Sequence, residues 1–146
     1  MFKQIVLFAL VTVSVSANLE FTNCGSASQV VAFRLRGCDA TPCTFRRGGE
    51  YYGEMDVIAA VPTNVLPFVI QAILGFPLPP VTIFDGNACD DLTVGSCPTH
   101  VGQAITARLY MDIPTTLPAI STNVRATVRD ALNQVQVCVQ IPVSLI

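Results

Sequence analysis

Residues 105–113 have the sequence Ile-Thr-Ala-Arg-Leu-Tyr-Met-Asp-Ile, in which every second side chain is apolar and Thr106, Arg108 and Asp112 stand between them. A period of two predicts a β-strand with one buried face and one face in water. The same alternation recurs in segments 31–35, 51–57, 124–129 and 135–141. The chain is therefore expected to be built largely from strands of this kind.

Turn signals separate these segments, and helical spacing is hard to find anywhere in the chain. The turn signals are Arg47-Gly48-Gly49, Asp85-Gly86-Asn87 and residues 130–133. One-sided strands joined by turns predict an all-β fold of antiparallel sheets packed face to face.

Residues 65–81 depart from the alternation because they are apolar on both faces and carry no charge. Such a run predicts either a strand buried on both sides or a segment that lines a cavity. Its prolines exclude a regular central strand at the end of the run, so residues 77–80 are expected to form an extended rim or edge.

The first seventeen residues have the pattern of a secretory signal peptide. Lys3 precedes the apolar residues 5–15, and Ala17 follows small residues at the expected cleavage site. The remaining chain, residues 18–146, has a length that suits one domain. We therefore expect a secreted, extracellular protein. The chain after residue 17 contains no N-x-S/T sequon, so a glycan-based lysosomal address is not expected.

Charge and hydropathy restrict the partners of this domain. Beyond Lys3 the chain contains seven arginines and ten acidic residues, which gives a net charge of −3 and no basic footprint for nucleic acid. Prolines interrupt the most apolar later stretch, so no membrane-spanning segment is expected there and the protein should be soluble. We also expect it to be a monomer.

Six cysteines in a secreted chain predict three disulfides. Fifteen pairings are open, but locality favours Cys38 with Cys43 and Cys89 with Cys97, each pair flanking a short polar loop. That choice leaves Cys24 and Cys138. Zinc is the rival interpretation, and the absence of CxxC pairs and the single histidine disfavour it.

Catalytic and cofactor motifs are missing. His100 is the one histidine, and no G-x-S-x-G elbow accompanies it, so a solvated loop histidine is expected rather than a catalytic base. Asp85, Asp90 and Asp91 lack the spacing of a calcium loop. No P-loop or dinucleotide fingerprint is present. The sequence predicts no enzyme, no metal and no cofactor, while Arg46 and Arg47 leave an anionic-lipid contact open as a minor alternative.

The chain after residue 17 resembles the ML (lipid-recognition) family, in particular the Niemann–Pick type C two-like sterol carriers and the mite group-two allergens. The likeness covers essentially all of residues 18–146. It is carried by Asn23-Cys24-Gly25-Ser26, Gly37-Cys38, Pro42-Cys43, Gly48-Gly49, Gly75-Phe76-Pro77-Leu78-Pro79, Asp85-Gly86, Cys97-Pro98, Leu117-Pro118 and Cys138 with Ile141-Pro142-Val143.

The resemblance implies an immunoglobulin-like sandwich with disulfides 24–138, 38–43 and 89–97, and a sterol held between its sheets. It implies an opening near Gly75–Pro79 and the loop before Leu117. Where the sterol carriers have aromatic residues, this chain has Pro80, Leu117 and Ala126, whereas Ile113 stays aliphatic. The loss of aromatic bulk leaves room for a fatty acid or a small apolar semiochemical.

The leading hypothesis is a non-enzymatic carrier that holds a sterol or another apolar lipid and transfers it, with a membrane or a lipid-acceptor protein as further partner. Small inward residues, Gly53, Ala107 and Ala126, would leave room in the core. The candidates for the lining and rim are Val31, Phe33, Met55, Val57, Phe68, Ile73, Phe76, Leu78, Pro80, Ile105, Leu109, Ile113, Leu117, Val124 and Val139. The alternatives are an innate-immune module for microbial lipids, a secreted esterase and a closed structural sandwich.

Overall fold

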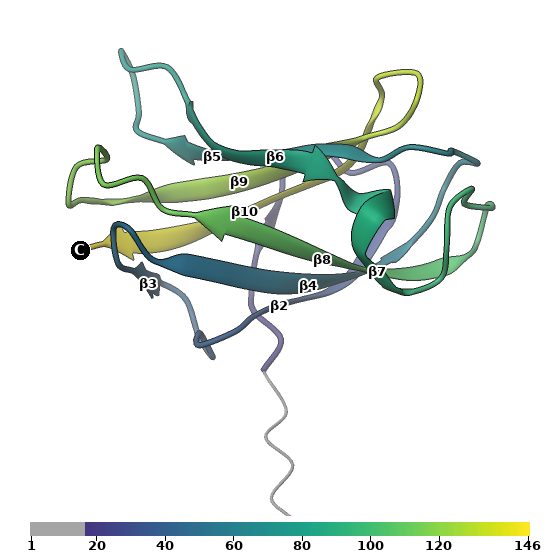
Figure 1. The fold of residues 1–146 in the computed structure, drawn as a ribbon, viewed down its shortest axis with the longest axis horizontal. Helices are drawn as coiled ribbons and strands as arrows, with labels where there is room; N and C mark the ends of the chain where they lie inside the picture. Colours follow the sequence, from purple (N-terminus) through teal and green to yellow (C-terminus); the bar gives the residue numbers. More distant parts are fainter. Residues whose placement is uncertain (1–16) are drawn as a thin grey trace, which may run out of the picture.

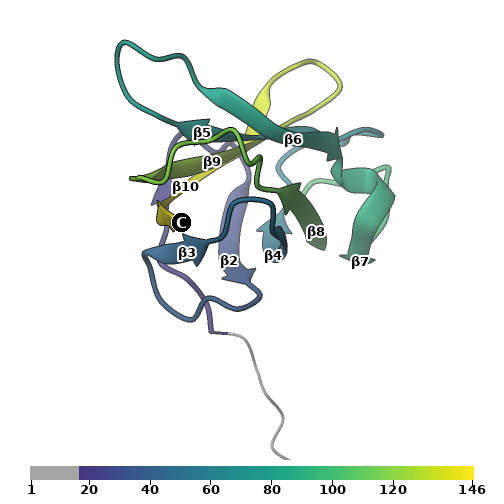
Figure 2. The ribbon, with the colours of Figure 1, turned by 60° about the vertical axis from the view of Figure 1, so that its left-hand side comes forward.

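The computed structural model describes residues 17–146, which fold into two β-sheets packed face to face (Figures 1 and 2). The expected signal peptide therefore lies outside the described residues except for Ala17. Both sheets are antiparallel apart from one short parallel pair, and the fold is an immunoglobulin-like sandwich. The prediction of an all-β sandwich is confirmed.

The first sheet has six strands in the order β1-β10-β9-β5-β6, and β3 pairs with the end of β10. Its strands are β1 (Thr22–Asn23), β3 (Cys43–Phe45), β5 (Pro67–Ile73), β6 (Val81–Asn87), β9 (Ser121–Arg129) and β10 (Val135–Leu145). The β3–β10 pair is the parallel one.

The second sheet has four strands in the order β2-β4-β8-β7. Its strands are β2 (Gln29–Leu35), β4 (Glu50–Ile58), β7 (Leu92–Val94) and β8 (Ala104–Asp112), and a 3₁₀ turn, η1 (Ala88–Asp91), leads into β7. The five segments predicted by alternation coincide with β2, β4, β8, β9 and β10. No helix of the described residues is long and apolar enough to cross a membrane.

The connections gather at two ends of the sandwich (Figure 1). We call the end with the β5–β6 and β8–β9 connections the rim end, and the end with the β4–β5, β7–β8 and β9–β10 connections the closed end. Between them the apolar faces of the two sheets form one continuous core, to which Met55, Ile105 and Val139 contribute.

Val31 was expected to face the core, and that prediction is wrong. A register shift between Val30 and Ala32 interrupts the β2–β4 pairing, and Val31 is 55% exposed. A β-bulge of this kind inserts one residue and reverses the alternation on one side of it. Beyond the bulge, Phe33 and Leu35 are buried as predicted.

Asp85-Gly86-Asn87 forms the end of β6 and not a turn, so this expectation is wrong as well. Gly86 pairs with Phe68 on β5, and a Cβ atom at residue 86 would lie 3.1 Å from the Phe68 ring. A side chain at this position would press on the ring, and glycine permits the close approach. The chain turns only after Asn87, whose side chain accepts a hydrogen bond from the Cys89 amide.

Residues 65–81 form β5 and the β5–β6 hairpin. Within β5 the buried residues Phe68, Ile70 and Ala72 alternate with half-buried Val69, Gln71 and Ile73, so the two faces are unequal. The strand lies between β9 and β6, which explains its low polarity. Residues 75–80 are exposed at the tip of the hairpin, in agreement with the predicted rim.

The three disulfides join Cys24 with Cys138, Cys38 with Cys43, and Cys89 with Cys97. These are the pairs that locality favours. The first lies within one sheet, because Cys24 directly follows β1 and Cys138 is in β10. The last ties η1, which follows β6, to the loop after β7, and therefore joins the two sheets at the closed end.

An ion pair crosses the outer face of the second sheet. Arg34 on β2 donates to both carboxylate oxygens of Asp56 on β4, at 2.7 and 2.9 Å, and the Thr106 hydroxyl on β8 adds a bond of 2.8 Å. The hydrogen bonds from Arg34 lower the pKa of Asp56 below its ordinary value; partial burial opposes this, and Thr106 reinforces it.

We expect Asp56→Asn to reduce the free energy of unfolding by at most about 1 kcal/mol at neutral pH, because the pair is partly exposed to solvent. A carboxyl with a lowered folded-state pKa stabilises the fold above its unfolded pKa, and this contribution is lost as the pH falls through the folded value. Urea titrations at pH 7 and in acid should therefore show a difference between variant and parent that shrinks as the pH falls below the ordinary pKa of 3.8 and vanishes below the lower folded-state pKa. A difference that grows in acid contradicts this.

Candidate functional site: two apolar cavities between the sheets

Two cavities lie between the sheets, one toward each end of the sandwich. The first, which we call the rim cavity, is lined only by apolar residues and is nearer the rim end. Its lining consists of Phe33, Leu35, Gly53, Ile70, Leu109, Met111, Val124, Ala126, Val139 and Ile141.

The second cavity is nearer the closed end, and we call it the polar-capped cavity because four polar residues join its apolar lining. It is lined by Ser28, Met55, Val57, Ala59, Val61, Thr63, Leu66, Ala88, Thr99, Ile105, Ala107, Leu109, Val128, Gln136 and Val137. Leu109 lines both cavities and lies between them.

Each cavity has a volume of about 30 Å³. That is room for about one water molecule, whereas pockets for small-molecule ligands span roughly 300–1,000 Å³. The expectation of one open gap between the sheets is therefore wrong in its dimensions. Side chains from both sheets meet in the core, as they do in most protein interiors, and the space that remains is divided at Leu109.

Small residues form part of both linings, as the sequence suggested. Gly53 and Ala126 line the rim cavity, and Ala107 lines the polar-capped cavity. A Cβ at residue 53 would lie 2.8 Å from the carbonyl oxygen of Arg34, so close packing of β4 against β2 also requires this glycine.

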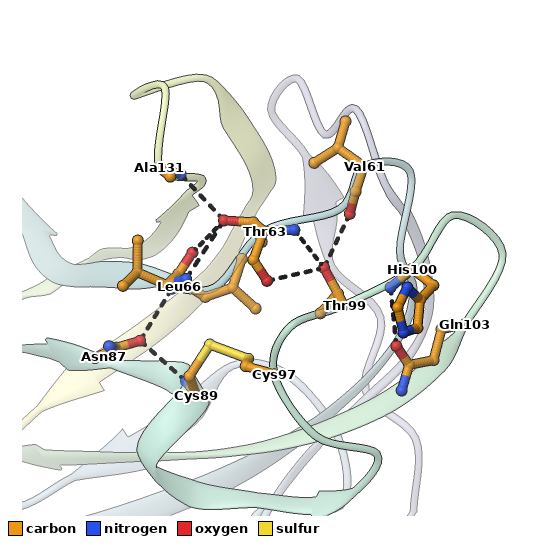
Figure 3. The surroundings of a disulfide bond; sticks show 11 residues. Val61, Thr63, Leu66, Asn87, Cys89, Cys97, Thr99, His100, Gln103 and Ala131 are labelled. Atoms are coloured by element: carbon orange, nitrogen blue, oxygen red, sulfur yellow. Dashed lines mark hydrogen bonds between the residues drawn. A yellow bond between two sulfur atoms is a disulfide. The ribbon is translucent and has the colours of Figure 1, made fainter.

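The closed end is held by hydrogen bonds and one disulfide (Figure 3). The Thr99 hydroxyl donates to the carbonyl of Val61 at 2.9 Å and accepts from the amide of Thr63 at 3.0 Å. The Thr63 hydroxyl donates to the carbonyl of Val65 and accepts from the amide of Ala131. These bonds join the β4–β5, β7–β8 and β9–β10 connections.

Asn87 and the nearby disulfide extend this network. The Asn87 carbonyl oxygen accepts from the amides of Leu66 at 2.9 Å and Cys89 at 3.1 Å, and Cys89 is bonded to Cys97 (Figure 3). The loop before β5 is thereby tied to η1. Every connection at the closed end is crosslinked to a neighbour.

Ser28 and Gln136 are polar lining residues that the sequence reasoning missed. The alternation of residues 135–141 predicts that Gln136, between Val135 and Val137, lies on the wet face of its strand, but it is only 3% exposed. A register shift between Val135 and Val137 forms a β-bulge, which allows the adjacent Gln136 and Val137 both to line the cavity. Alternation alone cannot reveal such a residue.

The rim end is built differently. Phe76 is fully exposed and Leu78 is 57% exposed at the tip of the β5–β6 hairpin, beside exposed Pro80. In the β8–β9 connection, Ile113 and Leu117 are buried in the core. The Arg47 side chain donates to the carbonyl of Leu117 at 3.2 Å. Leu117 was expected at an open rim, and it instead belongs to the packed core.

The other candidates divide among three locations. The cavity linings include Phe33, Met55, Val57, Ile105, Leu109, Val124 and Val139. Phe68 is buried in the core without lining either cavity, and Ile73 lies on the half-buried face of β5. Ile70, its neighbour Ala72 and Leu66 face the core, and continuing the alternation from Phe68 would have found the first two.

The residues considered for catalysis or calcium do not assemble. His100 is exposed, and its backbone amide, not its imidazole, bonds Gln103 (Figure 3). Asp85, Asp90 and Asp91 are not part of any group of three metal-ligating side chains within residues 17–146.

Comparison with known proteins gives relatives along nearly the whole chain. Mite group 2 allergen Tyr p 2 of Tyrophagus putrescentiae is 24% identical over 123 residues, which cover 84% of each chain. Mite group 2 allergen Lep d 2 of Lepidoglyphus destructor is 28% identical over 128 residues, covering 88% of this chain and 85% of the allergen.

Two solved structures share the fold. A Niemann-Pick type C2 protein from Japanese carpenter ant superposes with a TM-score of 0.73 at 20% identity, covering 87% of this chain and 99% of the ant protein. Chicken MD-1 complexed with lipid IVa gives a TM-score of 0.57 at 10% identity, covering 84% and 85%. The ML domain model matches residues 18–145, and the chain therefore belongs to the ML-domain family.

Proposed function

We propose that this protein is a secreted, non-enzymatic carrier that holds a sterol or a similar apolar lipid between its two sheets and transfers it. One observation carries the proposal: two cavities with an almost wholly aliphatic lining run along the interior of a small sandwich. Burying several hundred Å² of lipid at about 25 cal/mol per Å² provides on the order of 10 kcal/mol before entropic costs.

Binding requires the core to widen, because the two cavities together are far smaller than a lipid. The closed end resists separation, since hydrogen bonds and the Cys89–Cys97 disulfide tie its connections together. The sheets therefore separate at the rim end, with Leu117 moving out of the core and Leu109 ceasing to divide the space. The lipid then enters beside the β5–β6 hairpin.

Mass spectrometry of the lipid fraction that copurifies with the natively secreted protein tests the proposal. We expect a stoichiometric apolar lipid, with denatured protein taken through the same extraction as the control. Purified protein that carries no lipid and takes up none from sterols, fatty acids or small apolar semiochemicals would exclude a carrier.

The exposed hairpin tip supports a further partner, a membrane surface that gives or receives the lipid. Phe76 and Leu78 are exposed apolar side chains, and residues 75–80 carry no charge. Two arginines, Arg46 and Arg47, lie in the turn before β4, and the start of β4 pairs with the rim end of β8. Arg46 is exposed, and the Arg47 side chain bonds the carbonyl of Leu117. Exposed apolar side chains with cations at the same end of the sandwich favour the interface of an anionic bilayer.

We expect the double substitution Phe76→Ser and Leu78→Ser to slow lipid transfer to anionic vesicles about tenfold or more and to leave equilibrium affinity unchanged. Each side chain contributes about 1.5–3 kcal/mol if fully buried in the interface, and only part of this is realised. Transfer of a fluorescent sterol, followed by stopped flow, measures the rate.

Leu132 provides the matched control because it is 81% exposed in the β9–β10 turn at the closed end. Leu132→Ser should leave the transfer rate unchanged. Equal slowing by both variants would show that general surface hydrophobicity, and not the rim, governs transfer.

A second candidate is recognition of microbial lipids by innate immunity. It is supported by the shared fold of chicken MD-1, which was crystallised with lipid IVa. The same cavities would serve, and a receptor would be the additional partner. Competition between a sterol and a lipopolysaccharide precursor for the purified protein separates the two candidates.

Secretion is part of the proposal as well. The ML domain match begins at residue 18, directly after the expected cleavage site. N-terminal sequencing of protein from the culture medium should therefore begin at Asn18.

A further inference from the structure

We propose that the polar-capped cavity selects lipids that carry one neutral oxygen, a hydroxyl or a carbonyl, at the end that is buried deepest. This inference rests on the proposed carrier function and specifies its ligand class. The recognising group is the side-chain amide of Gln136, which lies at the closed end of the cavity and is held there by Ser28.

Thr63 and Thr99 also line this end, but their hydroxyl groups already serve the backbone. Each donates to one carbonyl and accepts from at least one amide in the loops of the closed end. Their role is therefore to fix the shape of the cap, and they have little capacity left for a ligand.

The side-chain amide of Gln136 has more capacity, and Ser28 helps to hold it in place. The Ser28 hydroxyl donates to Oε1 of Gln136 at 2.9 Å and accepts from the amide of Ala60 at 3.2 Å. Nε2 of Gln136 donates to Oδ2 of Asp130 at 2.9 Å. A primary amide has two N–H donors and two acceptor lone pairs, and the bonds within residues 17–146 use one of each.

The orientation of the amide follows from its neighbours. A carboxylate only accepts hydrogen bonds, so the group that faces Asp130 must be Nε2, and Oε1 must face Ser28. Asp130 is itself buried and accepts from the amides of Leu132 and Gln134. Gln136 is thus held in place by both of its neighbours and presents one donor and one acceptor.

The charge of the cap determines which ligand oxygen fits. The cavity lining contains no lysine, arginine or histidine, and Asp130 lies directly behind Gln136. A buried carboxylate needs a cation or several donors, and here it would approach another carboxylate instead. A hydroxyl can accept from Nε2 and donate to Oε1, and a carbonyl can accept from Nε2, so neutral oxygens satisfy the amide without burying a charge.

The test uses three ligands of equal chain length, hexadecane, 1-hexadecanol and hexadecanoic acid, against the unchanged full-length secreted protein. Affinity is measured by displacement of an environment-sensitive apolar dye. We expect the alcohol to bind about tenfold more tightly than the alkane, the factor that one net hydrogen bond provides, and also more tightly than the ionised acid.

Two variants on β10 then locate the preference. Gln136→Leu should abolish the advantage of the alcohol over the alkane. Gln140→Leu is the matched control, since Gln140 is on the same strand, bonds Arg125 and lines neither cavity; it should keep the full preference.

The outcomes separate this inference from the carrier proposal. Binding of all three ligands with equal affinity, or a preference for the acid, overturns the selection of neutral oxygens and leaves the carrier function standing. An alcohol preference that survives in Gln136→Leu places the recognising group elsewhere and also overturns it. Should that variant fail to fold, the ligand series on the unchanged protein still decides. If the protein binds none of the three ligands and no sterol, the carrier function itself is rejected.

Discussion

Replacing Cys24 and Cys138 together by alanine is expected to lower the free energy of unfolding by about 4–5 kcal/mol. The two residues are separated by 114 positions, so their crosslink restricts almost the entire unfolded chain. Small domains are stable by only about 5–15 kcal/mol, and the variant should therefore be largely unfolded at modest urea concentrations. Urea titration monitored by far-ultraviolet circular dichroism measures the change.

The Cys38–Cys43 disulfide provides the comparison because its residues are only five positions apart. The corresponding double alanine variant should lose about 2 kcal/mol by the same chain-entropy argument. Equal losses in the two variants would contradict it and would point to local packing around each bridge. The Cys24 amide also donates to the Cys138 carbonyl at 2.9 Å, a bond that alanine keeps.

Much of this fold can be predicted because alternation survives wherever a strand has one buried face. In β8, buried residues alternate with more exposed ones from Ile105 to Met111, as the period of two predicts. β4 behaves in the same way, since it pairs with β8 from Glu50 to Ile58 without a register shift. Regular pairing preserves the pattern.

The prediction fails where the backbone inserts an extra residue. Val31 and Gln136 stand at register shifts in β2 and β10, and each faces the opposite side from the one expected. Nothing in the residue types marks these positions, because a bulge depends on the partner strand. The second failure has the greater consequence, since Gln136 is central to the polar cap.

The closed end was also beyond the reach of sequence patterns. Ser28, Thr63 and Thr99 belong to three separate connections that meet only in the folded chain. Each is a common loop residue, and only its burial and its partners distinguish it from a solvated one. Side-chain packing likewise determines that the interior is divided at Leu109, which no periodicity could indicate.

Ala126 offers the most direct test of where the lipid lies. It lies in the middle of β9, pairs with Ile70 on β5 and Val139 on β10, and lines the rim cavity with both of them. Any lipid that enters from the rim end and reaches Leu109 must pass this surface. A larger side chain here occupies space that the guest needs.

Ala126→Leu is therefore expected to weaken lipid binding about 10- to 100-fold, because overpacking a filled site costs roughly 1–3 kcal/mol and each 1.4 kcal/mol is a factor of ten. Dye displacement by a sterol measures the loss, and thermal unfolding shows whether the fold survives the added side chain. Ala104→Leu is the control, since Ala104 is exposed at the start of β8. This variant should bind lipid as tightly as the parent protein. A folded Ala126→Leu protein with undiminished affinity would mean that lipid does not occupy the space between the sheets at the rim end. In that case the apolar interior would serve the stability of the sandwich alone.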